Sequence, residues 1–221
     1  HGVFTEFAKG RKVSPMPFKR ITFDEAMLTY GCDKPDLRNP LKIFDVTSVF
    51  KESDFLAFKN AIHKGSIVRA IQGTGAAQQS RNFFDKLNKW AQDQGAPGLG
   101  YIIFDEEGAK GPIQKFLTQD HLQNLKTMLN LGTGDAVFFV CALPKDAQRL
   151  AGLARTKIAE ELNLIDKDVF EFCWVVDFPM YEYNDDLKKV DFYHNPFSMP
   201  QGGMDALLQE DPLTIKAYQY D

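Results

Sequence analysis

The middle of the chain alternates between two patterns of hydrophobic and polar residues. Residues 66–72, 99–104 and 136–143 are short apolar runs, which predict β-strands. Residues 79–91 and 146–164 place apolar side chains three and four positions apart, which predicts amphipathic helices. This alternation predicts an α+β fold of two layers, with an antiparallel or mixed sheet and its helices on one side.

Three local signals add further elements. Thr22 and Glu25 have the spacing of a capping box and predict a short helix after them. Thr118 is expected to cap a second helix, which ends at Gly132. Residues 55–58 are apolar and are predicted as one more strand.

The C-terminal part contains the pattern of a β-hairpin. Residues 173–182 and 189–194 are strand-like and flank the polar turn Asn184-Asp185-Asp186. The second strand leads to His194, which is followed by the rigid tripeptide Asn195-Pro196-Phe197. The hairpin is therefore predicted to present a histidine at its end.

These patterns divide the chain into three parts. Residues 1–42 begin as a connector rich in proline, lysine and arginine and include the charged string DKPDLRNP. Residues 43–165 contain the alternating strands and helices, and residues 166–221 contain the hairpin. We predict that residues 43–165 fold as one domain, because they include several elements with an apolar face.

Composition excludes several classes of protein. The formal net charge of −4 argues against a surface that binds phosphate along its whole length. The three cysteines are far apart in sequence and lack the spacing of zinc ligands, so no metal site is predicted and the thiols are expected to be reduced in the cytoplasm. The longest apolar runs are too short to span a membrane, and no membrane association is expected.

Two strings resemble the bacterial aspartyl-tRNA synthetases, which are class II enzymes. Residues 30–40 read YGCDKPDLRNP, where the family has serine at the position of Cys32. Residues 174–182 read WVVDFPMYE, and many relatives have a second histidine where this chain has Asn195. Between the two strings, residues 98–116 and 134–141 resemble the GAD domain, an insertion that these synthetases share with amidotransferase subunits of the tRNA-dependent pathway.

The resemblance implies a function for a longer parent protein. That protein would activate L-aspartate with ATP and Mg²⁺, transfer it to tRNA(Asp), and act in the cytoplasm as a homodimer. The sequence leaves open whether tRNA(Asn) is also charged. The arginine motifs that bind ATP in the family are not recognised in these 221 residues, nor is the anticodon-binding domain. We therefore expect a GAD-like domain with partial segments of the class II antiparallel sheet, which binds no cofactor, has no catalytic residue of its own and is inactive alone.

Five residues are candidates for specific roles. By the resemblance, His194 contacts the L-aspartate substrate, although spacing alone favours a histidine that bonds to backbone groups at a strand end. Lys34, Asp36 and Arg38 are candidates for contacts with tRNA or between domains, and ion pairing within the loop is favoured. Asp177 lies in an apolar strand, so we predict a structural partner such as an arginine.

Two other functions stay open at this stage. The chain could be a non-enzymatic module that docks tRNA or a protein. It could also be an independent enzyme that uses Asp177, Glu182 and His194.

Overall fold

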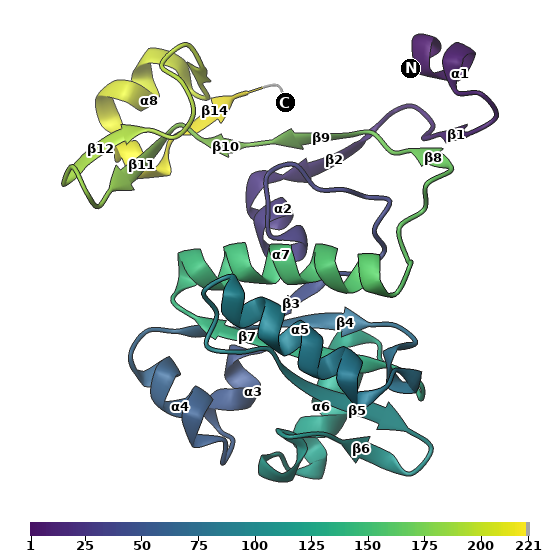
Figure 1. Cartoon of the computed structure of the whole chain (residues 1–221). Helices are drawn as coiled ribbons and strands as arrows, with labels where there is room; N and C mark the ends of the chain where they lie inside the picture. The colour runs from purple at the N-terminus through teal and green to yellow at the C-terminus, as the bar shows by residue number, and fades with distance from the viewer. Residues whose placement is uncertain (220–221) are drawn as a thin grey trace. The chain divides into compact units, whose positions relative to one another are not determined.

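The computed structural model describes residues 1–219, which form two compact units (Figure 1). The central unit is Leu28–Lys167, and the terminal unit combines His1–Met27 with the chain after Lys167. Helix α2 (Phe23–Tyr30) runs across the first boundary. No helix within the described residues has the length and apolar character needed to cross a membrane.

An antiparallel sheet of five strands forms the middle of the central unit. The strand order is β3-β4-β7-β5-β6, so β7 lies at the centre. The strands are β3 (Ile43–Asp45), β4 (Ile67–Gly73), β5 (Gly100–Asp105), β6 (Gly108–Lys110) and β7 (Ala136–Ala142). The predicted strands at residues 66–72, 99–104 and 136–143 are confirmed as β4, β5 and β7.

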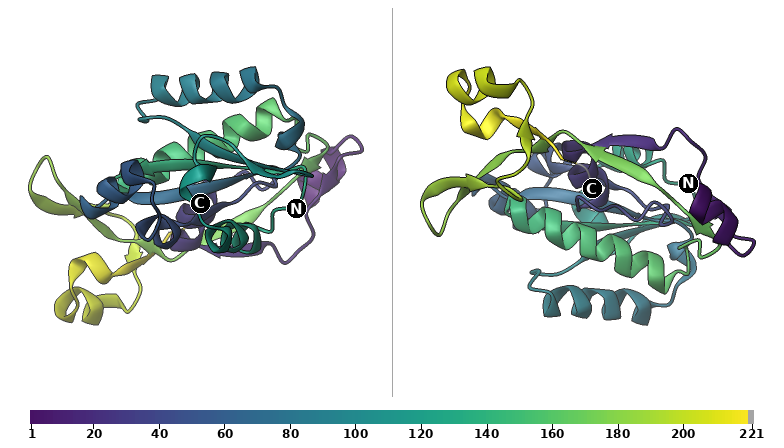
Figure 2. Two further views of the ribbon diagram at one scale, coloured as in Figure 1. Left: turned by 90° about the horizontal axis from the view of Figure 1, so that it is seen from below. Right: turned by 90° about the horizontal axis from the view of Figure 1, so that it is seen from above.

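Both faces of this sheet are buried, because side chains of β7 alternate between two cores. Phe138 and Val140 belong to one core, and Val137 and Phe139 belong to the other. Figures 1 and 2 show helices on both sides of the sheet. The α+β class is confirmed, but the prediction of two layers with helices on one side is wrong. The continuous apolar run of β7 is typical of a strand that is covered on both faces.

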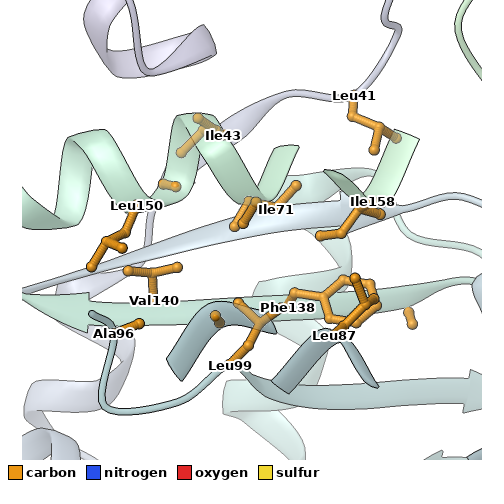
Figure 3. Packing of buried hydrophobic residues seen from close by; sticks show 14 of the residues in the cluster. Leu41, Ile43, Ile71, Leu87, Ala96, Leu99, Phe138, Val140, Leu150 and Ile158 are labelled. Atoms are coloured by element: carbon orange, nitrogen blue, oxygen red, sulfur yellow. The ribbon is translucent and has the colours of Figure 1, made fainter. Parts of the chain in front are cut away.

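The first core lies between the sheet and two long helices, α5 (Arg81–Asp93) and α7 (Pro144–Glu161). Phe84 and Leu87 of α5 are buried there, and the Phe84 ring stacks on Tyr101 with centroids 4.3 Å apart. Figure 3 shows this core, with Leu41, Ile43, Ile71, Leu87, Ala96, Leu99, Phe138, Val140, Leu150 and Ile158. The helical periodicity predicted for residues 79–91 and 146–164 is therefore confirmed.

The second core contains α3 (Thr47–Lys51), α4 (Leu56–His63) and α6 (Gln119–Leu129). Residues 55–58 were predicted as a strand, and this is wrong, because Leu56 begins helix α4. A run of four apolar residues is too short to distinguish the two periodicities. Thr118 caps α6 as predicted, but the helix ends at Leu129, before the left-handed C-cap residue Asn130 (φ 49°), and not at Gly132.

The terminal unit consists of short strands and helices. Two parallel pairs join β1 (Lys12–Val13) to β8 (Val169–Phe170) and β2 (Lys19–Thr22) to β9 (Cys173–Val176). An antiparallel sheet has the order β10 (Phe178–Pro179), β14 (Lys216–Tyr218), β13 (Met199–Pro200). The remaining elements are the hairpin of β11 (Tyr181–Asn184) and β12 (Lys189–Phe192) and the helices α1 (Gly2–Phe7) and α8 (Gly203–Gln209).

The central unit begins at Leu28 and not at the predicted residue 43. One reason is a close contact between the end of α2 and helix α7. Gly31 has φ +76°, and a Cβ atom added to Gly152 of α7 would lie 2.8 Å from the Gly31 carbonyl oxygen. Residues 28–42 therefore pack on the central unit, and glycine at both positions permits the approach.

We expect Gly152→Ala to destabilise the chain. In an open helix this change stabilises by about 0.5–1 kcal/mol, but here the new methyl group meets backbone atoms and overpacks the contact. The free energy of unfolding in urea should fall by about 1–2 kcal/mol. Thr156→Ala, at an exposed position one turn further along α7, is the control. A stabilised Gly152→Ala protein would contradict the importance of this contact.

Candidate functional site

The hairpin of β11 and β12 positions the predicted substrate-binding histidine. Four residue pairs connect the strands, from Tyr181 opposite Phe192 to Asn184 opposite Lys189. The Asn184 side-chain oxygen accepts hydrogen bonds from the backbone N–H groups of Asp186 (3.1 Å) and Leu187 (3.0 Å). The predicted hairpin and its polar turn are therefore confirmed.

His194 follows the end of β12 and is exposed. Its imidazole meets the buried ring of Phe178 edge to face, with centroids 5.4 Å apart, and lies 4.9 Å from the ring of Tyr193. The Tyr193 N–H donates to the Met180 carbonyl at 3.0 Å, which ties this stretch to the hairpin. Two aromatic rings thus contact the imidazole, a group whose nitrogens can in general donate a hydrogen bond to a carboxylate.

The side chain of Asn195 forms hydrogen bonds within the turn that follows His194. Its side-chain oxygen accepts from the Phe197 N–H at 3.0 Å and lies 3.4 Å from the Ser198 hydroxyl. This is an Asx turn, in which a short polar side chain fixes its own backbone. Asn195 therefore shapes the turn that follows His194.

Asp177 interrupts the strand predicted over residues 173–182. It adopts φ +60°, so β9 and β10 are separate strands with different partners. Its carboxylate accepts a hydrogen bond from Nε2 of Gln201 at 2.9 Å. The structure thus gives Asp177 a structural partner, as predicted, but the partner is a glutamine amide and not an arginine, which was our example.

Asp36 and Arg38 form a two-point ion pair in the central unit. Arg38 Nε and Nη2 donate to the two carboxylate oxygens of Asp36 at 2.9 and 2.8 Å, and the Arg38 backbone N–H donates at 3.0 Å. The Arg38 guanidinium lowers the pKa of the Asp36 carboxyl, and the carboxylate raises the pKa of Arg38. Lys34 instead forms an ion pair with Asp33 at 2.9 Å. Pairing within the loop is thus present, and the contacts with tRNA or another domain stay a prediction.

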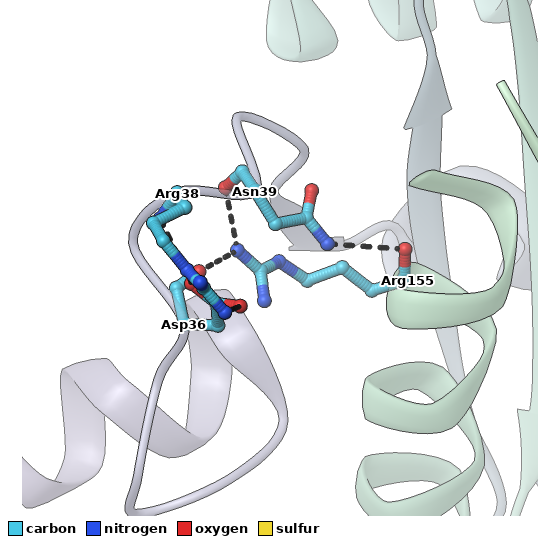
Figure 4. Close-up of polar contacts among 4 residues, drawn as sticks. All are labelled: Asp36, Arg38, Asn39 and Arg155. Carbon is cyan, nitrogen blue, oxygen red and sulfur yellow. Dashed lines mark hydrogen bonds and ion pairs between the residues drawn. The ribbon is translucent and has the colours of Figure 1, made fainter. Parts of the chain in front are cut away.

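Arg155 of α7 organises this loop and was not identified from the sequence (Figure 4). Its guanidinium donates to three backbone carbonyls, those of Asp36 (2.9 Å), Asn39 (2.7 Å) and Leu41 (2.6 Å). Asn39 returns a bond from its side-chain amide to the Arg155 carbonyl at 3.3 Å. Arg155 is only 2% exposed, and burial lowers the pKa of its guanidinium.

Sequence periodicity could have indicated Arg155. It directly follows Ala154, which belongs to the inward face of α7, so a charged residue occurs at the edge of an apolar stripe. The identity of its partners could not be read in this way, because they lie more than a hundred positions earlier in the chain.

We expect Arg155→Ala to destabilise the central unit strongly. The substitution leaves three inward carbonyl groups without their charged donor, and a hydrogen bond to a charged group contributes about 1.5–3 kcal/mol. The free energy of unfolding in urea should fall by about 3 kcal/mol or more. Arg149→Ala removes a half-exposed arginine from the same helix and should change it by less than about 0.5 kcal/mol. Equal effects of the two substitutions would contradict the role of Arg155.

The sequence-predicted residues belong to two different structural units. Asp36 and Arg38 contact each other in the central unit, Lys34 pairs with Asp33 there, and His194 belongs to the terminal unit. Residues 1–219 contain no group of three or more histidine, cysteine, aspartate or glutamate side chains suited to hold a metal ion.

Comparison with known proteins supports the resemblance found in the sequence. Residues 58–151 match the family model of the GAD domain and lie within the central unit. The whole chain is 60% identical over 220 residues to the aspartate–tRNA(Asp/Asn) ligase of Paramagnetospirillum magneticum. It is 58% identical over 226 residues to the protein of that name from Beijerinckia indica, and 54% identical over 224 residues to that of Rickettsia bellii.

These matches cover nearly all of this chain but a limited part of the relatives. They include 100%, 100% and 99% of the chain and 25%, 38% and 37% of the three proteins, respectively. The chain therefore spans between a quarter and about two fifths of the length of the curated relatives that it matches. The resemblance to a synthetase segment with a GAD domain is confirmed.

Proposed function

We propose that this chain, which belongs to the aspartate–tRNA ligase family, is a segment of an enzyme that activates L-aspartate with ATP and transfers it to tRNA. The observation that carries the proposal is the 54–60% identity that extends over both structural units. A shared GAD domain would concern the central unit alone, whereas this identity includes the His194 hairpin.

The names of the relatives bear on the identity of the RNA substrates. They specify both tRNA(Asp) and tRNA(Asn), and we propose that the longer protein charges both. We also propose that ATP and Mg²⁺ are bound by parts of the protein outside this chain, that the protein is a homodimer, and that it acts in the cytoplasm. These last proposals rest on the family resemblance of the sequence.

Within this function, His194 is proposed to recognise the substrate. Its position after a short, tightly paired hairpin and beside Phe178 restricts the ring, and its exposure allows contact with a small ligand. An imidazole N–H can donate to the carboxylate of L-aspartate. Lys34 has a 66% exposed side chain and is proposed to contact tRNA phosphate or another part of the longer protein.

The second candidate function is a docking module without catalysis. It is supported by the compactness of Leu28–Lys167, whose sheet is covered on both faces within the unit itself. Aminoacylation assays separate this candidate from the ligase.

The longer protein should catalyse exchange of pyrophosphate into ATP that depends on L-aspartate. The 221-residue chain should give only background exchange, because it spans a minor part of the relatives' length. The longer protein should also charge transcripts of both tRNA(Asp) and tRNA(Asn). Absence of L-aspartate-dependent exchange in the folded longer protein would refute the proposed activity, and charging of tRNA(Asp) alone would refute the dual specificity.

His194→Ala in the longer protein should weaken use of L-aspartate. Loss of a hydrogen bond to a charged group costs about 1.5–3 kcal/mol, so kcat/KM for L-aspartate should fall by about one to two powers of ten while KM for ATP changes little. Steady-state exchange at varied L-aspartate measures this effect. The matched control is His63→Ala, which removes an exposed histidine at the end of α4.

Thermal unfolding of both histidine variants checks that they are folded. If His194→Ala folds normally and retains the kinetics of the His63→Ala control, His194 does not contact the substrate and has a structural role at the strand end.

A further inference from the structure

A large cavity lies in the central unit and has no role in the proposed reaction. Its volume is about 810 Å³, which is within the range of about 300–1,000 Å³ typical of small-molecule sites. It is bordered by the start of α4, one side of α5, the first residues of β5 and the loop after β6. All of these segments belong to one compact unit.

Aromatic rings from two helices and a strand line the cavity. Phe55 and Phe58 meet edge to face at 4.7 Å, and Phe84 stacks on Tyr101 at 4.3 Å. Phe84 is buried and stacks on Tyr101 and Phe138, so the partly exposed rings of Phe55, Phe58 and Tyr101 form the surface that a ligand can meet. Such a surface suits a flat ring system, because every nucleobase can stack on protein aromatics.

Three polar side chains of α5 also line the cavity at intervals of four and three residues, so they share one face of the helix. These are Arg81, Asp85 and Asn88. The Asn88 side-chain oxygen accepts from the Leu99 N–H at 2.8 Å, which fixes the amide and leaves its NH₂ group to donate to a ligand. The Asp85 carboxylate supplies an acceptor on the neighbouring turn.

Arg81 adds a cation at the solvent side of the cavity. Its side chain is 89% exposed and lies 3.8 Å from Asp85, a loose ion pair that permits the guanidinium to turn toward another anion. Arginine is well suited to phosphate, since its planar donors bind two oxygen atoms at once.

We propose that this cavity binds a purine nucleotide. The base lies against the aromatic walls, its polar edge faces Asp85 and Asn88, and its phosphate lies next to Arg81. A nucleobase edge carries both hydrogen-bond donors and acceptors, which matches this pair of side chains, and the two fused rings of a purine offer the larger area to the aromatic surface. A phenylalanine or tryptophan side chain from a protein partner offers neither an acceptor for Asn88 nor a negative charge for Arg81.

This chemistry has two sources, a free nucleotide or an unstacked base of single-stranded RNA. The experiment is a titration of the ¹⁵N-labelled 221-residue chain with AMP, GMP, an oligoadenylate, the same oligonucleotide with abasic positions, and N-acetyltryptophanamide. The backbone amides of Gly98, Gly100 and Gly111 line the cavity and should shift, whereas those of Gly65 and Gly134 should not. Binding of mononucleotides identifies a free nucleotide site; binding of intact but not abasic RNA without mononucleotide binding identifies an RNA base site.

Matched variants of α5 test the polar contacts. Arg81→Ala and Asp85→Ala should each weaken binding about tenfold or more, as expected for loss of a charge-assisted hydrogen bond. Lys89→Ala and Asp93→Ala remove another exposed pair with the same spacing on this helix, away from the cavity, and should leave the affinity unchanged. All four positions are exposed, and thermal unfolding checks their fold.

Three results would overturn the proposal. They are absence of glycine shifts with every purine ligand at millimolar concentration, equal affinities in the Arg81→Ala and Lys89→Ala proteins, and binding of the tryptophan compound in preference to the nucleotides. The ligase proposal is tested by pyrophosphate exchange and is independent of each of these results.

Discussion

Burial of the Arg155 guanidinium is the interaction on which the boundary of the central unit depends. A buried cation is tolerated when its donors are satisfied, and here three carbonyl oxygens of residues 36–41 satisfy them. The loop, in turn, has no regular secondary structure over residues 33–40 to fix its conformation. The helix therefore provides the donors that determine the shape of the loop, and the loop provides the acceptors that allow the arginine to be buried.

This mutual dependence changes how the charged string DKPDLRNP is interpreted. Asp36 and Arg38 neutralise each other on the surface of the loop, while the backbone carbonyls of Asp36 and Asn39 point to Arg155. Asp36 thus directs its side chain to Arg38 and its carbonyl to Arg155, whereas Asn39 directs both its side chain and its carbonyl to Arg155. An effect of Asp36 or Arg38 substitutions on RNA binding must therefore be separated from an effect on loop conformation.

Local sequence patterns predicted much of the fold, but they did not predict the features that depend on contacts between distant residues. The apolar runs gave β4, β5 and β7, periodicity gave α5 and α7, and the polar turn gave the C-terminal hairpin. The segment at residues 55–58 was assigned wrongly because a run of four apolar residues is too short to distinguish helical from strand periodicity. The number of layers and the start of the central unit were also misjudged. Both depend on contacts between distant residues, namely the packing of α3, α4 and α6 on the second face and the approach of Gly31 to Gly152.

In the candidate site, too, the sequence predicted only part of the geometry. The motif around His194 predicted a histidine at a hairpin end, but the left-handed backbone of Asp177, its bond to Gln201 and the Asx turn at Asn195 required the structure. Asn195 fixes the turn after the hairpin, whereas Asp177, before the hairpin, accepts a hydrogen bond from the distant Gln201. The position of His194 therefore follows from backbone geometry and aromatic packing.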